Sequence, residues 1–128
     1  VHAVCSARAG RMNSFLKYFE DTLFMDIKDI HNCAYQGIHA GCAAGGWYSV
    51  FRGVMGITVR DCIIETDPVH MPFWEEVSLS FHVGDTKVKA VQTQDAIVFE
   101  KVSGKDIKVK FNGTMYELKK ELTFVFRH

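Results

Sequence analysis

The sequence has little of three things: long apolar runs, excess charge of one sign, and cysteine. No purely apolar stretch reaches the roughly 18 residues that argue for a transmembrane helix. Fifteen basic and fifteen acidic residues cancel, so the basic footprint of a nucleic-acid binder is missing. The same balance argues against attachment to anionic lipid. Four cysteines are too few for a disulfide scaffold, and we interpret them as reduced thiols in a cytoplasmic protein.

The first residues, VHAVCSARAG, lack both an initiating Met and the charged-then-apolar layout of a signal peptide. We therefore expect the chain to begin partway through a larger protein. Its 128 residues, 48% of them apolar, suffice for one domain or two small ones with a packed core.

Glycine, proline and charge are unevenly distributed along the chain. Six of the ten glycines lie between Gly37 and Gly56, no proline precedes Pro68, and charged residues become dense after Ile57. This pattern divides the chain into two differently built halves, residues 1–57 and residues 58–128.

The first half has helical patterns. We expect a helix from Ala3 to Ala9 that Gly10 ends, followed by a second helix. Asn13 or Ser14 would cap the second helix, which should end between residues 26 and 29. Its apolar residues recur on one helical stripe; they are Phe15, Leu16, Phe19 and Leu23.

A third helix is predicted from about Ile38 to Gly56. It is apolar nearly all round, so it should be buried on most sides. Each internal glycine costs roughly 1 kcal/mol of helix propensity, so their presence indicates close approach by neighbouring backbones or a ligand. These glycines are Gly41, Gly45, Gly46 and Gly53.

The second half has the patterns of β-structure. Residues 77–83 and 86–93 alternate apolar and polar side chains with period two. Asn112-Gly113 is a hairpin signal because both residues tolerate positive φ. Six or seven short strands predict an antiparallel β-sandwich.

Residues 37–57, GIHAGCAAGGWYSVFRGVMGI, resemble the last barrel helix of glycoside hydrolase family 65. Gly37-Ile38-His39 and the Gly53-x-x-Gly56 spacing carry the likeness. Residues 1–11 and 15–29 look like the preceding helices of that family, and residues 63–92 look like the start of its C-terminal sandwich. The resemblance covers about residues 1–118. The family contains inverting phosphorylases of maltose, trehalose and kojibiose, and some α-glucoside hydrolases.

The resemblance implies an α+β chain in which residues 1–57 end an (α/α)6 catalytic barrel and residues 58–128 form an antiparallel C-terminal β-sandwich domain. The family's catalytic acid, a Glu, lies upstream of these residues. The resemblance therefore implies that the 128-residue chain alone is inactive, whereas the larger enzyme cleaves α-linked glucose disaccharides with phosphate or water. The expected partners are the disaccharide, phosphate, the upstream barrel and a second copy in a homo-oligomer. No cofactor, nucleic acid or membrane is expected.

The resemblance makes His39, with Gly37, the candidate phosphate or substrate site. A histidine at a helix N-terminus can donate a charge-assisted hydrogen bond to an anion. The alternative is a core histidine that caps the helix. Ala34 and Gln36 depart from the Thr and the acidic residue that many members carry before the Gly, so phosphorolysis and hydrolysis both stay open.

Two further alternatives remain from the residues themselves. His31, Cys33, His39 and Cys42 are possible zinc ligands, but their spacing fits no common zinc module, and buried thiols with a loop histidine are favoured; no metal is expected. Trp47, Tyr48 and Phe51 could stack on a sugar, but aromatics at helical spacing are more often core. The chain as a whole could instead be a non-catalytic β-sandwich module that binds carbohydrate or buttresses a barrel.

Overall fold

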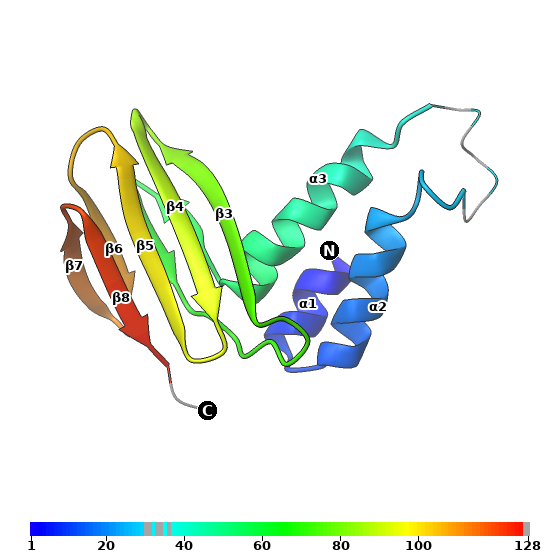
Figure 1. The fold of residues 1–128 in the computed structure, drawn as a ribbon, viewed down its shortest axis with the longest axis horizontal. Helices are drawn as coiled ribbons and strands as arrows, with labels where there is room; N and C mark the ends of the chain where they lie inside the picture. The colour runs from blue at the N-terminus through cyan, green and yellow to red at the C-terminus, as the bar shows by residue number, and fades with distance from the viewer. Residues whose placement is uncertain (30–31, 33–34, 36, 127–128) are drawn as a thin grey trace. The chain divides into compact units, whose positions relative to one another are not determined.

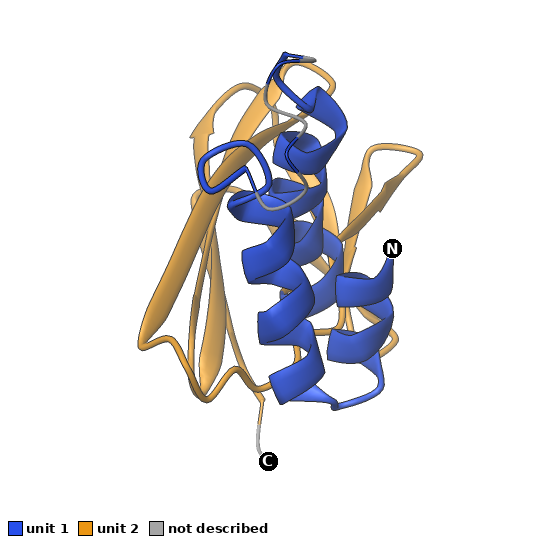
Figure 2. Ribbon diagram, turned by 90° about the vertical axis from the view of Figure 1, so that its right-hand side faces the viewer, with its two compact units in different colours: residues 1–54 blue, residues 55–128 orange. Residues whose placement is uncertain are grey.

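The computed structural model describes residues 1–29, 32, 35 and 37–126. The chain divides into two compact units, Val1–Val54 and Met55–His128, which Figure 2 colours separately. The first unit is helical and the second consists of strands, so the α+β class is confirmed. The change from helix to strand falls between Val54 and Thr58. Within the described part of the chain, no helix combines the length and the apolarity needed to cross a membrane.

The helical unit contains a helical hairpin, α1 and α2, followed by a third helix (Figure 1). The hairpin turns at Gly10, whose φ of +70° is the left-handed conformation predicted for a helix stop. The predicted caps of α2 are wrong: the carbonyl of Arg11 already accepts from the Phe15 N–H, so the helix begins directly after the turn. The elements are α1 (His2–Arg8), α2 (Met12–Leu23), α3 (Ala40–Tyr48) and the π-helical turn η2 (Ser49–Val54).

Small residues bring these helices close together. A Cβ at Gly53 would lie 3.3 Å from the Cα of Val4 on α1, and a Cβ at Gly46 would lie 2.7 Å from Cδ2 of Leu23 on α2. The predicted close approach of a neighbouring backbone is therefore confirmed at Gly53, whereas Gly46 is approached by a side chain. The prediction is wrong at Gly41, where a Cβ would meet open space.

The third helix is shorter and more exposed than its pattern predicted. It runs from Ala40 through η2 to Val54, and within α3 only Gly46 is buried. Trp47 and Tyr48 are 45% and 49% exposed. The buried residues lie in η2 instead, where Gly53 meets α1. The prediction of burial on most sides is wrong for α3, because the described helices of this unit cover only part of its surface.

This exposed apolar face predicts self-association of the isolated chain. Apolar patches larger than a few hundred Å² are rare on monomeric proteins. We expect light scattering to give a mass above the 14.5 kDa of one chain at high concentration, falling on dilution. A monodisperse monomer at every concentration would contradict this expectation.

The second unit consists of two four-stranded sheets (Figure 1). One sheet has the strand order β1-β2-β6-β7, with bounds β1 (Thr58–Arg60), β2 (Ile63–Thr66), β6 (Ile107–Phe111) and β7 (Thr114–Leu118). The other has the order β3-β4-β5-β8, with bounds β3 (Glu76–Val83), β4 (Thr86–Thr93), β5 (Ala96–Ser103) and β8 (Glu121–Val125).

The two sheets pack face to face, as the predicted sandwich requires. Phe124 of β8 stacks on Phe111 of β6 with ring centroids 4.7 Å apart, and it contacts Phe99 and Tyr116 edge-on at 6.3 Å and 5.0 Å. These contacts join strands of both sheets. Alternate residues of β4 and β6 are buried, which is the period-two pattern of a half-buried strand.

The expectation of a purely antiparallel sandwich is wrong in one place. β2 pairs with β6 in parallel, with Ile64 opposite Val109. The chain leaves this sheet after Thr66, builds three strands of the other sheet, and returns at Ile107 in the same direction as β2. A parallel pair needs such a long crossover connection. The short strands β1 and β2 were also not predicted.

Three hairpins turn on residues with positive φ, one of them at Gly84 between β3 and β4, with φ 57°. Asn112 and Gly113 have φ values of 48° and 78°, which confirms the predicted turn. The β1–β2 hairpin turns at Asp61 and Cys62, with φ values of 50° and 60°. A cysteine thus occupies a place that two-residue hairpins usually give to glycine.

Replacing Cys62 with glycine is therefore expected to stabilise the chain. The left-handed conformation costs a non-glycine residue about 1–2 kcal/mol, and the greater unfolded-state freedom of glycine offsets part of that gain. We expect Cys62→Gly to raise the free energy of unfolding by about 0.5–1 kcal/mol, measured by urea denaturation. Cys62→Ser keeps the strained backbone and should change little. A destabilised Cys62→Gly variant would contradict the explanation.

Candidate functional site

His39 lies at the N-terminus of α3, where the sequence places it. It is the residue immediately before the first helical residue, Ala40. Its backbone N–H donates to Oδ2 of Asp26 over 2.9 Å, and its ring Nδ1 hydrogen-bonds Oδ1 of the same carboxylate. Asp26 lies just beyond the end of α2. One carboxylate thus holds both the backbone and the ring of His39.

These bonds set the ionisation of Asp26. The His39 ring, and next its backbone N–H, donate to the carboxylate and lower the pKa of Asp26 below its ordinary value of 3.8. Asp26 is therefore ionised at neutral pH and can only accept hydrogen bonds, so Nδ1 of His39 carries the proton between them. This leaves Nε2 for another partner, and 33% of the surface of the His39 side chain is exposed.

The lowered pKa of Asp26 makes a prediction about acid stability. A carboxylate whose pKa falls on folding stabilises the protein above its unfolded pKa, and this contribution is lost as the pH falls through the folded pKa. We expect Asp26→Asn to lower the thermal unfolding midpoint at neutral pH, and the gap from the wild type to close as the pH falls through the lowered pKa of Asp26. Circular dichroism melts of both proteins measure it. A gap that persists unchanged in acid would show that the charge of Asp26 is not the cause.

Gly37 and Ile38 lead into this helix start. Gly37 has φ +98° and open space where a Cβ would lie, and Ile38 is 85% exposed. The Gly37 backbone is thus accessible, although its predicted phosphate role stays a prediction. Ala34 and Gln36, the departures from the family pattern, lie outside the described residues.

The zinc alternative gains no support from the described residues. Cys42 lies in the first turn of α3, while His31 and Cys33 lie outside the part of the chain that the structure describes. In that part, no three His, Cys, Asp or Glu side chains group as metal ligands. Cys5, Cys42 and Cys62 are free thiols.

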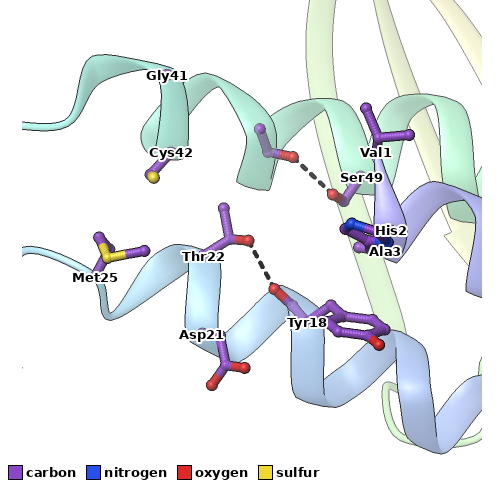
Figure 3. A pocket seen from close by; sticks show the side chains of 11 residues that line it. Val1, His2, Ala3, Tyr18, Asp21, Thr22, Met25, Gly41, Cys42 and Ser49 are labelled. Carbon is purple, nitrogen blue, oxygen red and sulfur yellow. Dashed lines mark hydrogen bonds between the residues drawn. The ribbon is translucent and has the colours of Figure 1, made fainter. Parts of the chain in front are cut away.

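A pocket of about 270 Å³ lies among the helices of the first unit (Figure 3). Two of its hydroxyls donate to carbonyls of their own helices: Thr22 Oγ1 to the Tyr18 carbonyl and Ser49 Oγ to the Gly45 carbonyl, each over 2.7 Å. The lining does not include His39, so the structure does not bring the predicted site residue into this pocket. The lining residues are Val1, His2, Ala3, Tyr18, Asp21, Thr22, Met25, Gly41, Cys42, Gly45 and Ser49.

The aromatic residues of the third helix form a stacked pair. The rings of Trp47 and Phe51 lie 4.6 Å apart with an angle of 17° between their planes. Phe51 is half-buried, whereas Trp47 and Tyr48 keep close to half of their surface exposed. The prediction that all three belong to a core is therefore only partly met.

Searches by sequence found relatives among the disaccharide phosphorylases, although no family model matches the chain. The chain is 47% identical over 116 residues to 3-O-alpha-D-glucosyl-L-rhamnose phosphorylase of Lachnoclostridium phytofermentans, covering 91% of this chain and 15% of that protein. It is 23% identical to alpha,alpha-trehalose phosphorylase of Geobacillus stearothermophilus, covering 97% and 17%. It is 22% identical to kojibiose phosphorylase of Escherichia coli K12, covering 97% and 16%.

A solved structure has the same fold. It is assigned as a kojibiose phosphorylase from the human microbiome and superposes with a TM-score of 0.86 at 18% identity, covering 99% of this chain and 19% of that chain. At this identity the likeness shows the fold alone.

The chain is thus homologous to the C-terminal part of disaccharide phosphorylases. It belongs to glycoside hydrolase family 65, as the motifs of residues 37–57 indicated. The chain spans only 15–17% of the length of these curated relatives.

Proposed function

We propose that this chain serves as the C-terminal part of an inverting phosphorylase of α-glucosidic disaccharides. Phosphate would attack the anomeric carbon opposite the departing sugar and yield a β-sugar 1-phosphate. The curated relatives support phosphorolysis over hydrolysis, because each of the three is named a phosphorylase.

The proposed substrate is a glucosyl-rhamnose disaccharide. The 47% identity to 3-O-alpha-D-glucosyl-L-rhamnose phosphorylase exceeds by far the 23% and 22% to the trehalose and kojibiose enzymes. The three disaccharides share a glucosyl unit and differ in the acceptor sugar. The comparison therefore favours rhamnose as the acceptor.

The site that carries this proposal is His39 at the start of α3. Its Nδ1 is held by Asp26, and its partly exposed ring can direct Nε2 to an anion. Backbone N–H groups at a helix N-terminus favour the same ligand. In the proposed enzyme, His39 binds phosphate, and the open backbone at Gly37 lets phosphate approach.

The rest of the chain has supporting roles in this proposal. Residues 1–57 complete an (α/α)6 barrel, residues 58–128 form the C-terminal domain, and a Glu of the upstream barrel supplies the acid for the leaving oxygen. The 128-residue chain alone then has no turnover. The assembled enzyme needs no metal or organic cofactor and works in the cytoplasm as a homo-oligomer.

The test uses the protein expressed from the complete open reading frame that contains this chain. It is incubated with 3-O-α-D-glucosyl-L-rhamnose, trehalose or kojibiose, with and without phosphate, and products are followed by proton NMR. We expect β-glucose 1-phosphate from the rhamnose disaccharide, and only when phosphate is present. Glucose released without phosphate would instead identify a hydrolase, and no cleavage would favour a non-catalytic module.

A further inference from the structure

Both carboxylate oxygens of Asp26 bond the same residue, His39. Oδ1 pairs with the ring Nδ1 of His39, and Oδ2 accepts from the His39 backbone N–H over 2.9 Å. The two residues are 13 positions apart, and both are partly buried, with side-chain exposures of 29% and 33%. The ring can therefore neither turn over nor move away from the helix without breaking these bonds.

We propose that Asp26 is the positioning residue of the phosphate site and acts through His39. This inference rests on the proposed function. With Nδ1 held by a carboxylate, only Nε2 of the imidazole can face a ligand. Donation to phosphate then needs a proton on Nε2 as well, so the bound ring is an imidazolium lying between two anions. Asp26 balances that charge and fixes which nitrogen reaches the phosphate, as carboxylates do for other functional histidines.

A simpler role for Asp26 is to cap α3. A carboxylate that accepts from a backbone N–H at a helix N-terminus stabilises the helix, and Oδ2 of Asp26 accepts from the His39 N–H in this way. The cap uses the His39 backbone, whereas the positioning role uses its ring. Replacing the His39 side chain removes the bond to the ring and keeps the bond to the backbone N–H, so the two roles can be separated.

The experiment is a double-mutant cycle of Asp26→Asn and His39→Ala in the protein from the complete open reading frame. Kinetics are measured for phosphate and for the disaccharide. Loss of a carboxylate that orients a metal-binding histidine typically costs about 10- to 100-fold. By analogy, we expect Asp26→Asn to raise the phosphate KM about tenfold or more, with the disaccharide KM within about twofold. In the His39→Ala background, Asp26→Asn should have no further effect on the phosphate KM. Glu20→Gln, which removes an exposed charge from α2, is the control, and its KM values for phosphate and disaccharide should equal those of the wild type.

A capping role alone gives a different result. Asp26→Asn would then lower the melting temperature equally in both backgrounds while phosphate kinetics stay normal, which overturns the proposal. Equal, additive losses in phosphate affinity with and without the His39 ring overturn it as well. A wild-type enzyme that cleaves the disaccharide without phosphate, or not at all, overturns the proposed function, whereas phosphorolysis that Asp26→Asn leaves intact overturns only the role of Asp26.

Two measurements keep the test decisive if Asp26→Asn does not fold. Asp26→Glu retains the carboxylate at a longer reach and should keep part of the phosphate affinity that His39→Ala loses. Nitrogen-15 NMR of the wild-type imidazole should show His39 Nδ1 protonated at neutral pH. A neutral ring with its proton on Nε2 would contradict the bond to Asp26 on which the proposal depends.

Discussion

Replacing Gly56 with alanine is expected to lower the free energy of unfolding by more than about 4 kcal/mol, a loss that few single substitutions reach. Gly56 is buried, and its φ of +62° is strained for any residue with a Cβ. An added Cβ would lie 2.0 Å from the carbonyl oxygen and 2.5 Å from the carbonyl carbon of Asp67. Backbone atoms cannot rotate out of the way as a side chain can.

The surroundings of Gly56 offer little room for adjustment. The neighbouring Met55 carbonyl accepts a buried hydrogen bond of 2.8 Å from Thr66 Oγ1, so the two backbone segments are tied together directly beside the contact. Moving Asp67 to admit a methyl group would break that bond or displace the end of β2. Total stabilities of domains are about 5–15 kcal/mol, so this loss would remove roughly a quarter to four fifths of the stability of the chain.

Gly84→Ala is the matched control for this prediction. Gly84 has nearly the same φ, +57°, but its added Cβ would meet nothing within 4 Å. It therefore carries the conformational cost of about 1–2 kcal/mol without the collision. Urea denaturation of both variants isolates the steric part as the difference between them. Equal losses would mean that the Asp67 backbone yields easily, which would contradict the explanation.

The helices could be predicted from sequence because their signals are local. Gly10 ended α1 as expected, and the predicted apolar stripe of α2 is buried in part: Phe15 is fully buried, whereas Leu23 stays 42% exposed. The start of α3 was misplaced by two residues because it depends on a distant partner. His39 stays outside the helix, with its backbone N–H bonded to Asp26, and no local pattern announces a bond across 13 residues.

The strands show the same division between local and distant signals. The hairpin at Asn112-Gly113 was predicted because the turn residues themselves favour positive φ. The hairpin at Asp61-Cys62 was missed because cysteine gives no such signal. The parallel pairing of β2 with β6 depends on residues more than 40 positions apart, such as Ile64 and Val109, so alternation alone could not predict it.

The candidate site was predicted in part for the same reason. His39 belongs to a local motif and was found at the predicted helix start. Asp26 was placed only in the region where the second helix should end, although it supplies the charge that holds the His39 ring. No local pattern links Asp26 to a histidine 13 positions later, so this pairing could not be predicted from the sequence.

Replacing His39 with alanine is expected to weaken the use of phosphate far more than the use of the disaccharide. A hydrogen bond to a charged group contributes about 1.5–3 kcal/mol, which corresponds to roughly 10- to 150-fold in an equilibrium constant. The loss should appear in the phosphate KM if the bond is equally strong before and during the reaction. It should appear in kcat if the bond strengthens as the phosphate oxygen attacks.

The measurement is initial-rate kinetics of the protein from the complete open reading frame, with phosphate and disaccharide varied in turn. His82→Ala is the control, because His82 is an exposed histidine of β3 in the second unit. Its loss should leave the kinetics with phosphate and with disaccharide unchanged. A His39→Ala enzyme with normal phosphate kinetics and a lower melting temperature would make His39 a structural residue. Because Asp26 can still accept from the backbone N–H of Ala at this position, the helix start should survive the substitution, and the phosphate effect should then be seen without a large loss of stability.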